Sequence, residues 1–237
     1  MRVRVSSRSR AYFLAFFASV GLASASAAAE APAPARTTAP PPVQIDIGLH
    51  LGGVHRTGDA PAFPITGRAG VSFGVSAYVS PSPRYAFGLA FEHAGLGSER
   101  AEGDFGSVDL TRDLNLLWAG LRVSLLHTER VSLGLLIGPG LSWQGVSANG
   151  LLTPGIGALP SGYACAAGDT VNLGLRAGLG ARIALGSGVS FLADASVDNV
   201  RLASDVLDGC APGAGTVTLI GARVGFGYQF DVTSYVR

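Results

Sequence analysis

The sequence predicts an all-β fold, a closed antiparallel up-and-down transmembrane β-barrel of about eight strands. Three observations lead to this prediction. Apolar and polar residues alternate along segments of about nine or more residues from residue 43 onward, which is the length a membrane-spanning strand needs. Short and long connections alternate between these segments. No apolar run of 18 or more residues follows residue 30, which disfavours a helical membrane protein.

The alternation is clearest in the segment 171–183. Its odd-numbered positions are Val, Leu, Ala or Ile, and its even-numbered positions are Asn, Gly or Arg. Because successive side chains of a strand point to opposite faces, this segment is predicted to be a two-faced strand. Five further segments alternate in the same way: 43–52, 68–79, 85–92, 131–143 and 189–198.

Three places interrupt the pattern. The segment 109–125 changes phase near Leu116–Leu117, which predicts a β-bulge, and the last segment shows a similar slip near Leu219–Ile220. Pro139 cannot donate to a strand ladder, and a closed barrel has no free edge to accommodate it. We therefore expect a local bulge or a lost hydrogen bond at Pro139.

Periodicity alone also allows a soluble barrel whose apolar face points inward. The connections favour the membrane barrel, because those near 80–84, 126–130 and 186–188 are short, as periplasmic turns are. The long, polar connections, which are expected to be outer loops, lie near 55–66, 95–108, 147–169 and 202–215. The polar face is built largely of Gly and Ser, which suits a narrow lumen, and the apolar face carries almost no charge.

Four parts follow along the chain. Residues 1–27 read as a signal peptide, with four arginines, a short apolar region and small residues at the cleavage site. Residues 28–42 form a Pro/Ala-rich periplasmic spacer, 43–230 the barrel and 231–237 a short C-terminal tail. The predicted location is the bacterial outer membrane, with outer-membrane lipid and lipopolysaccharide as partners. No clustered basic patch points to nucleic acid.

The last predicted strand carries a specific motif. Residues 223–230 read RVGFGYQF, which matches the pattern polar, any, Gly, any, any, apolar, any, aromatic. In this motif, and in its architecture over residues 43–230, the chain resembles the small OmpA/OmpX-type outer-membrane β-barrel family. The resemblance implies that Arg223, Gly225, Tyr228 and Phe230 form an insertion signal that the outer-membrane assembly machinery reads.

The two cysteines, Cys165 and Cys210, fall in the third and fourth predicted outer loops. The periplasm is oxidising, so a disulfide between these loops is the leading interpretation. It would close a loop of about 44 residues and constrain the unfolded chain by roughly 4 kcal/mol. The alternatives are two free thiols or pairing with a partner.

Charged residues recur on the face predicted to line the lumen. In a narrow lumen such charges must pair, and we weigh two interpretations: an ion-pair plug that fills the barrel, and a narrow polar conduit. The predicted interior charges are Asp46, Arg68, Glu92, Asp113, Arg122, Arg176, Arg182, Asp194, Asp198 and Arg223, with His50 beside them.

The sequence shows no catalytic constellation. His93, at the outer end of its segment, has no nearby Ser, and neither a nucleophile with its base nor a metal-ligand cluster emerges. We therefore expect no cofactor and a non-catalytic structural or surface-interaction role through the outer loops, for a ligand the sequence does not identify. The alternative is a narrow small-solute or ion pore, and a lipid-modifying enzyme is the third hypothesis.

Overall fold

The computed structural model describes the predicted barrel region with gaps at several connections. The described residues are 43–57, 69–103, 106–153, 161–168, 171–202, 206–207, 211–212 and 215–232. The predicted signal peptide, the spacer and residues 233–237 of the predicted tail lie outside these ranges. No helix within the described ranges is long and apolar enough to cross a membrane.

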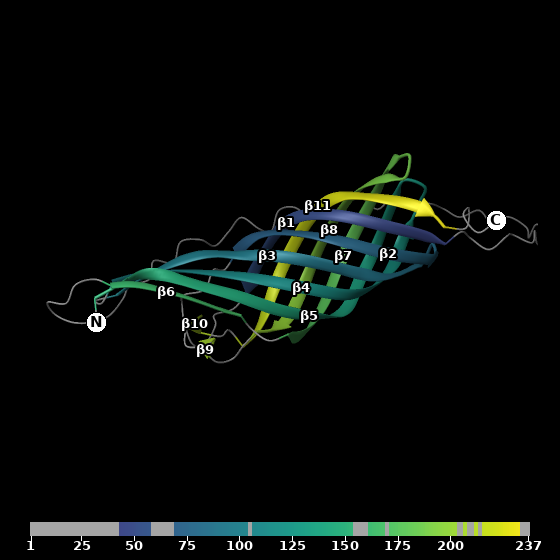
Figure 1. Cartoon of the computed structure of the whole chain (residues 1–237). Coiled ribbons are helices and arrows are strands. Elements are labelled where there is room, and N and C mark those ends of the chain that lie inside the picture. The colour runs from purple at the N-terminus through teal and green to yellow at the C-terminus, as the bar shows by residue number, and fades with distance from the viewer. Residues whose placement is uncertain are drawn as a thin grey trace, which may run out of the picture. The chain divides into compact units, whose positions relative to one another are not determined.

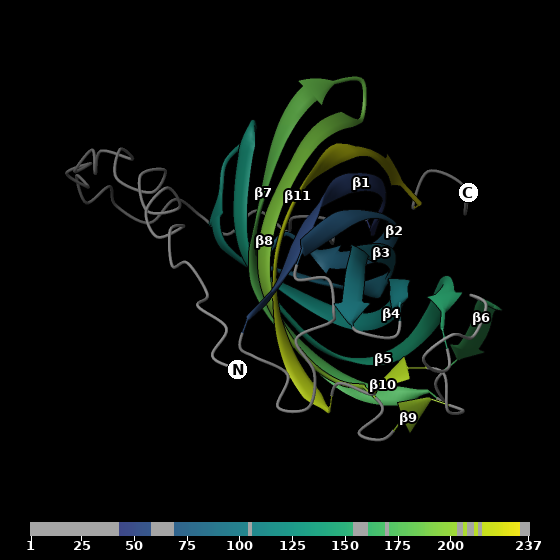
Figure 2. The same ribbon diagram turned by 90° about the vertical axis from the view of Figure 1, so that its left-hand side faces the viewer.

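The structure is built of strands. They are β1 Gln44–Thr57, β2 Ala69–Ser82, β3 Tyr85–Gly103, β4 Gly106–His127, β5 Val131–Leu152, β6 Ser161–Gly168, β7 Asn172–Gly186, β8 Val189–Arg201, β9 Val206–Leu207, β10 Ala211–Pro212 and β11 Thr216–Asp231. Eight of them form a ring in the order β4-β3-β2-β1-β11-β8-β7-β5, which the β4–β5 pairing closes. All pairings are antiparallel, so the predicted up-and-down barrel of eight strands is confirmed (Figures 1 and 2).

The outside of the ring is an apolar belt. Large hydrophobic side chains alternate outward along every barrel strand and are exposed, among them Leu49, Leu89, Leu173 and Phe226 at 63%, 57%, 74% and 61%. A soluble barrel would bury these side chains in its interior. A closed ring satisfies its backbone hydrogen bonds internally, and the belt matches the hydrocarbon region of a bilayer.

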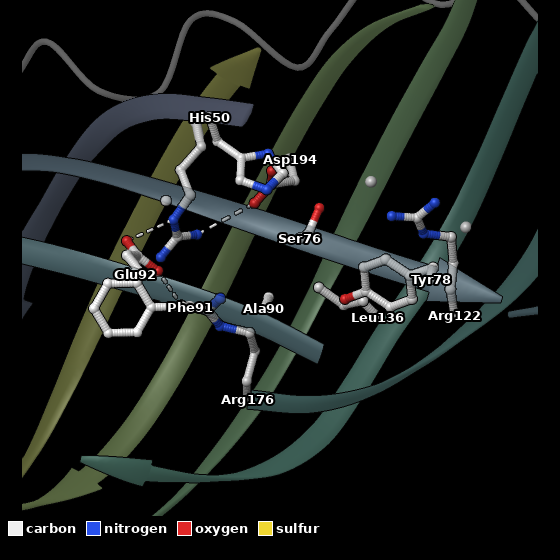
Figure 3. A pocket seen from close by; sticks show the side chains of 14 residues that line it. His50, Ser76, Tyr78, Ala90, Phe91, Glu92, Arg122, Leu136, Arg176 and Asp194 are labelled. Atoms are coloured by element: carbon white, nitrogen blue, oxygen red, sulfur yellow. Dashed lines mark hydrogen bonds and ion pairs between the residues drawn. The ribbon is translucent and has the colours of Figure 1, made fainter. Parts of the chain in front are cut away.

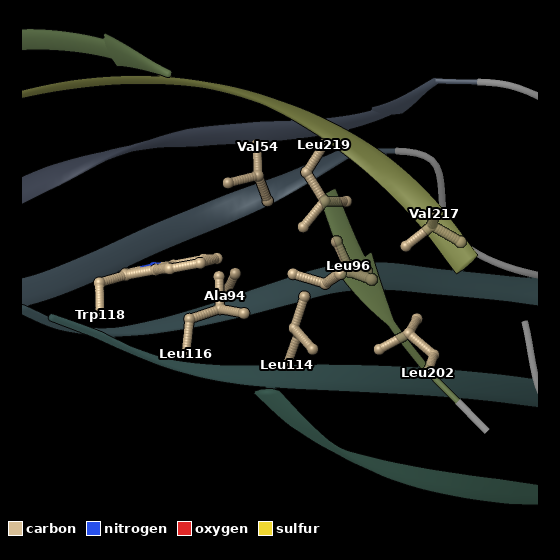
Figure 4. Close-up of a cluster of buried hydrophobic side chains, with 10 residues drawn as sticks. Val54, Ala94, Leu96, Leu114, Leu116, Trp118, Leu202, Val217 and Leu219 are labelled. Atoms are coloured by element: carbon tan, nitrogen blue, oxygen red, sulfur yellow. The ribbon is translucent and has the colours of Figure 1, made fainter. Parts of the chain in front are cut away.

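The inside of the ring is mainly apolar in its outer half, although the buried Arg56 and Arg112 also lie there. A cluster of ten inward side chains fills this space, and we call it the apolar layer (Figure 4). Its members are Val54, Ala94, Leu96, Leu114, Leu116, Trp118, Val200, Leu202, Val217 and Leu219.

The apolar layer corrects the two predicted phase slips. The β3–β4 register runs without a shift past Glu92↔Leu116, and the β8–β11 register runs without a shift past Asp198↔Leu219. The strands keep their phase, and what changes is the chemistry of the inward face, from polar to apolar. The register shifts lie elsewhere, between Val79 and Ser82, Gly95 and Ser98, Ser124 and Leu126, and Ala184 and Gly186.

Pro139 sits in the barrel wall on the outward face of β5. The β4–β5 ladder pairs Trp118 with Gly140 and resumes at Leu121 with Ile137, so the pairing is interrupted opposite Pro139 without a change of register. We expected either a bulge or a lost hydrogen bond at this proline. Because the register is the same on both sides of the gap in pairing, there is no bulge.

Three barrel strands continue beyond the belt. The upper parts of β3, β4 and β5 stay paired as far as Gly103, Gly106 and Leu152, and β6 adds a fourth strand along residues 145–152 of β5 (Figure 1). We call this four-stranded sheet the outer extension. The connections predicted near 95–108 and 147–169 are therefore largely strand rather than loop.

Candidate functional site

The middle of the lumen holds a network of five charged side chains, which we call the ionic layer. Glu92 of β3 accepts hydrogen bonds from Arg176 of β7 and from Arg223 of β11, both at 2.7 Å. Asp198 accepts two bonds from Arg176, at 2.7 and 2.6 Å, and a longer one from Arg223 at 3.4 Å. Asp194 accepts a bond from Arg223 at 3.2 Å. Because β3 is a ring neighbour of neither β7 nor β11, the two bonds to Glu92 cross the lumen (Figure 3), whereas those to Asp198 and Asp194 join adjacent strands.

Burial and small neighbours hold this network in place. Glu92, Asp198, Arg176 and Arg223 are all buried, and the ring of Trp118 lies over the Arg176 guanidinium at 4.5 Å. A Cβ at position 221 would lie 2.6 Å from an Arg223 nitrogen, so a larger residue there would displace the end of the Arg223 side chain. Gly221 and Gly52 thus leave the space that the Arg223 side chain occupies beside its carboxylates.

The half of the lumen below the ionic layer, toward the short turns, is more open. Arg182 of β7 donates to Asp46 of β1 across the lumen. Arg122 lies over the ring of Tyr78 at 4.4 Å. His50 lines two small cavities of about 40 Å³ each, which have room for ordered water.

The lumen is thus layered along the barrel axis. The end nearest the short turns, which we call the polar mouth, is lined by residues such as Asp46, Arg122 and Arg182. Above it lie the ionic layer and then the apolar layer. Trp118 belongs to the apolar layer and touches the ionic layer through Arg176. The closed ring, its apolar belt and an interior whose charges form ion pairs decide the class of protein. The chain is an integral outer-membrane β-barrel.

Most of the predicted interior charges of this outer-membrane barrel do face the lumen. Glu92, Arg176, Asp194, Asp198 and Arg223 meet in the ionic layer, Asp46 meets Arg182, and Arg122 stacks on Tyr78. Arg68 lies outside the described residues.

The prediction that Asp113 faces the lumen is wrong. Asp113 is exposed and pairs in register with Gly95 and Gly145, on the outward face of the outer extension. Its placement in the lumen followed from the supposed phase slip at Leu116. With the phase unbroken, the inward residue is its neighbour Arg112.

Two buried arginines were missed by the sequence reasoning. Arg56 and Arg112 are 3% and 1% exposed near the outer end of the barrel, and Arg112 donates to Gln144. A continuous period of two from Leu116 and Leu114 places Arg112 inward, so the signal was present in the sequence. The sequence predicts an outer loop near residues 55–66, which includes Arg56, but β1 continues to Thr57.

The residues of the predicted insertion signal lie on both faces of β11. Arg223 points into the ionic layer, whereas Tyr228 and Phe230 point outward with their rings 6.3 Å apart. Gly225 faces β1 so closely that a Cβ would lie 1.9 Å from the Leu49 carbonyl oxygen. The arginine and the glycine therefore have structural roles in this barrel, and recognition by the assembly machinery stays a prediction.

The outer extension has two unlike faces. Its inner face continues the lumen and carries an apolar cluster of Leu110, Val146 and Ala148, with Val108, Tyr163, Cys165 and Ala167 packed against it. Its outer face is mainly polar: Arg100 donates to Ser107 at 3.0 Å, and the hydroxyls of Thr111 and Ser147 lie 2.5 Å apart. The change from apolar to polar along the outward face marks the upper limit of the belt.

Cys165 lies in β6 on that inner face. Its Sγ is 3.1 Å from the Tyr163 hydroxyl. Cys210 lies outside the described residues, so its disulfide with Cys165 stays a prediction.

Histidine, cysteine and acidic residues form no metal-binding group in the part of the chain that the structure describes. No group of three or more His, Cys, Asp or Glu residues is placed to hold a metal ion there. His93 points outward, with its Nδ1 2.9 Å from the Asn115 Oδ1 and its ring 5.0 Å from that of Phe73. Its contacts are thus an amide and an aromatic ring rather than a nucleophile.

Comparison with known proteins supplies no close relative. No family model matches the chain, and no curated protein matches its sequence. Among solved structures, the chain is similar to Ail, the attachment invasion locus protein of Yersinia pestis, with 18% identity over 79% of this chain and 97% of that one, at a TM-score of 0.41. It is similar to a major outer membrane protein of Thermus thermophilus, with 14% identity over 79% and 99% of the two chains, at a TM-score of 0.47.

A third similar structure is the outer membrane protease OmpT of Escherichia coli, with 11% identity over 81% of this chain and 97% of that one, at a TM-score of 0.38. At these levels the likeness carries no argument about function. The assignment as an outer-membrane barrel rests on the ring, the belt and the short turns of this chain.

Proposed function

We propose that this barrel is a non-catalytic surface protein that binds a partner through its outer extension and outer loops, and that it does not conduct solutes. The outer extension is the observation that carries the proposal. Paired strand continues from Ser98 to Gly103 of β3 and from Gly145 to Leu152 of β5, above the end of the belt. At about 3.3 Å per residue, eight residues of β5 reach about 25 Å.

The free edge of β6 is the suggested contact. Among the described residues β6 pairs with β5 alone, which leaves its other edge available. Its sequence, SGYACAAG, has neither the charge nor the proline that usually protects an exposed edge strand. An extended segment of a partner can add to such an edge through backbone hydrogen bonds.

The lumen favours a binding role over the pore alternative. A solute crossing the barrel has to pass both the ionic layer and the apolar layer. The side chains of Leu96, Leu114, Leu116 and Leu219 in the apolar layer are fully buried against one another. Eight strands enclose a space that side chains fill, so both layers support a closed interior.

Two experiments test the proposal. In the first, a photo-crosslinking residue replaces Ala164 on the exposed face of β6, and intact cells are irradiated. A matched variant carries the same residue at Ser147, on the same face of the inner strand β5. Adducts at 164 that disappear when Ala166 is replaced by Lys support edge binding, because an edge lysine disfavours strand addition. Equal adducts at both positions contradict it.

The second experiment measures conductance. The refolded barrel is inserted into planar bilayers at neutral pH, with a heat-dependent shift in gel mobility as the check that it is folded. We expect no steady channels. Reproducible single-channel currents from folded protein would replace the binding role with the pore.

A further inference from the structure

The polar mouth at the short-turn end of the barrel opens into a chain of small cavities that share one residue, Arg122. The mouth holds a cavity of about 100 Å³, which Arg122, Arg182 and Ser132 help to line. Two cavities of about 40 Å³ lie further in, and both are lined by Arg122, His50 and Asp194. Arg122 therefore stands where the mouth meets the inner cavities.

Arg122 differs from the other arginines that the structure places in the middle and lower lumen. Arg176, Arg182 and Arg223 each donate to at least one carboxylate. The Arg122 guanidinium instead lies over the Tyr78 ring, on the far side of that ring from the ionic layer (Figure 3). A stacked arginine keeps its in-plane N–H donors available, so this cation has no carboxylate bonded to it and has unused donors.

The lining of the mouth has more arginines than carboxylates. The mouth is lined by the cations Arg122, Arg130 and Arg182, by His127, and by the carboxylates Asp46 and Glu129. Asp46 is bonded to Arg182, which leaves two arginines against Glu129. Counting its arginines against its carboxylates, the mouth thus has one cation more than its own acids balance.

Hydroxyl groups add neutral donors beside that charge. Ser80, Ser124 and Ser132 line the mouth cavity, and none of the three hydroxyls makes a hydrogen bond within the described part of the chain. Further in, the buried Nδ1 of His50 has no hydrogen-bond partner there either. Unused hydroxyls around an unpaired guanidinium match an anion with several acceptor oxygens.

We propose that the mouth binds a small oxyanion from the periplasmic side, with Arg122 as the charged donor and the serine hydroxyls as neutral donors. The cavity suits a group of the size of phosphate or of one carboxylate. Arg–phosphate and Arg–carboxylate contacts share the same two-pronged geometry, so either source satisfies the site. This site lies at the opposite end of the barrel from the outer extension and does not depend on the surface role.

The test is a titration of the full-length protein in lipid nanodiscs, followed by NMR of the backbone amides of Ser124 and Ser132. Inorganic phosphate is added at constant ionic strength, and sodium acetate is added in a separate series. We expect saturable shifts with at least one of the two, and the tighter one identifies the oxyanion class. Losing a charged donor costs about tenfold or more in affinity, so Arg122→Gln should weaken binding by at least that factor.

Two controls keep the result interpretable. Arg84→Gln removes the same charge from an exposed turn at the same end of the barrel, outside the cavity lining, and should bind like the wild type. Arg122→Lys keeps the charge but lacks the two-pronged donor, so its affinity should lie between those of the wild type and Arg122→Gln, with the gel-mobility shift as the check that the barrel is folded. Shifts that are equally strong in Arg122→Gln, or that never saturate with either anion, would overturn the proposal.

Discussion

Removing Asp198 is the sharpest test of the ionic layer. Its carboxylate is fully buried and accepts two short hydrogen bonds from Arg176. In an Asp198→Ala variant, the guanidinium keeps Glu92 but loses its two-pronged partner in a place that water barely reaches. Two hydrogen bonds to charged groups contribute about 1.5–3 kcal/mol each, and breaking a buried ion pair from one side costs about 3–5 kcal/mol. We expect the free energy of unfolding to fall by about 3–5 kcal/mol.

Asp194 provides the matched control. It is also an aspartate of β8 bonded to an arginine of the ionic layer, but its side chain is 19% exposed and its bond to Arg223 is 3.2 Å long. A partly solvated pair of this kind is worth about 1 kcal/mol or less, so Asp194→Ala should be mild. The difference between the two variants isolates the effect of burial.

The assay is equilibrium unfolding of the barrel in lipid vesicles, followed by tryptophan fluorescence. The ring of Trp118 lies over Arg176, so it reports directly on the layer, and a Trp143→Phe background removes the second indole. If Asp198→Ala loses no more stability than Asp194→Ala, burial of the ion pairs in the ionic layer does not stabilise the barrel.

Three further predictions follow from the same geometry. Leu89→Arg, in the middle of the belt, should destabilise the barrel by roughly 2–4 kcal/mol, whereas Leu151→Arg, on the outer extension, should change stability little; equal effects in vesicle unfolding would contradict the position of the belt. Gly140→Ala places a Cβ 2.2 Å from a ring carbon of Trp118, so the free energy of unfolding should fall by about 1–3 kcal/mol. An unchanged unfolding midpoint would count against that contact. Cys165 and Cys210 should be joined by a disulfide, and mass analysis under non-reducing conditions that finds two free thiols would refute it.

The eight strands and their outward face were predictable from the sequence for a physical reason. A lipid-facing side chain has one uniform environment, so Leu173 to Ile183 show an unbroken period of two. The short turns at the lower end were visible for a related reason, since they are brief interruptions between apolar runs. These features depend on local pattern alone.

The inside of the barrel was less predictable because it has two environments. In the middle and lower lumen, residues such as Arg176 and Asp198 alternate with the apolar outward face. Higher up, Leu114 and Leu116 face inward and are apolar, whereas their outward neighbours Asp113 and Asn115 are polar, so the pattern of the strand is inverted. In the sequence this inversion looks like a change of phase, which is why Asp113 is predicted on the lumen face. The pairing partners of the charges were also hidden, because Glu92 meets arginines 84 and 131 residues away.

The order of the layers explains why a small barrel can carry several buried charges. The guanidiniums of Arg176 and Arg223 each meet two or more carboxylates, and a charge that is bonded in this way no longer needs water. The apolar layer above keeps water away from the outer side, which strengthens those bonds through the low local dielectric. Below, the mouth is hydrated, and it is there that an arginine without a carboxylate can remain charged. The position of Arg122 on the wet side of the ionic layer is therefore a consequence of the layering, and it is also what makes that arginine available to an anion.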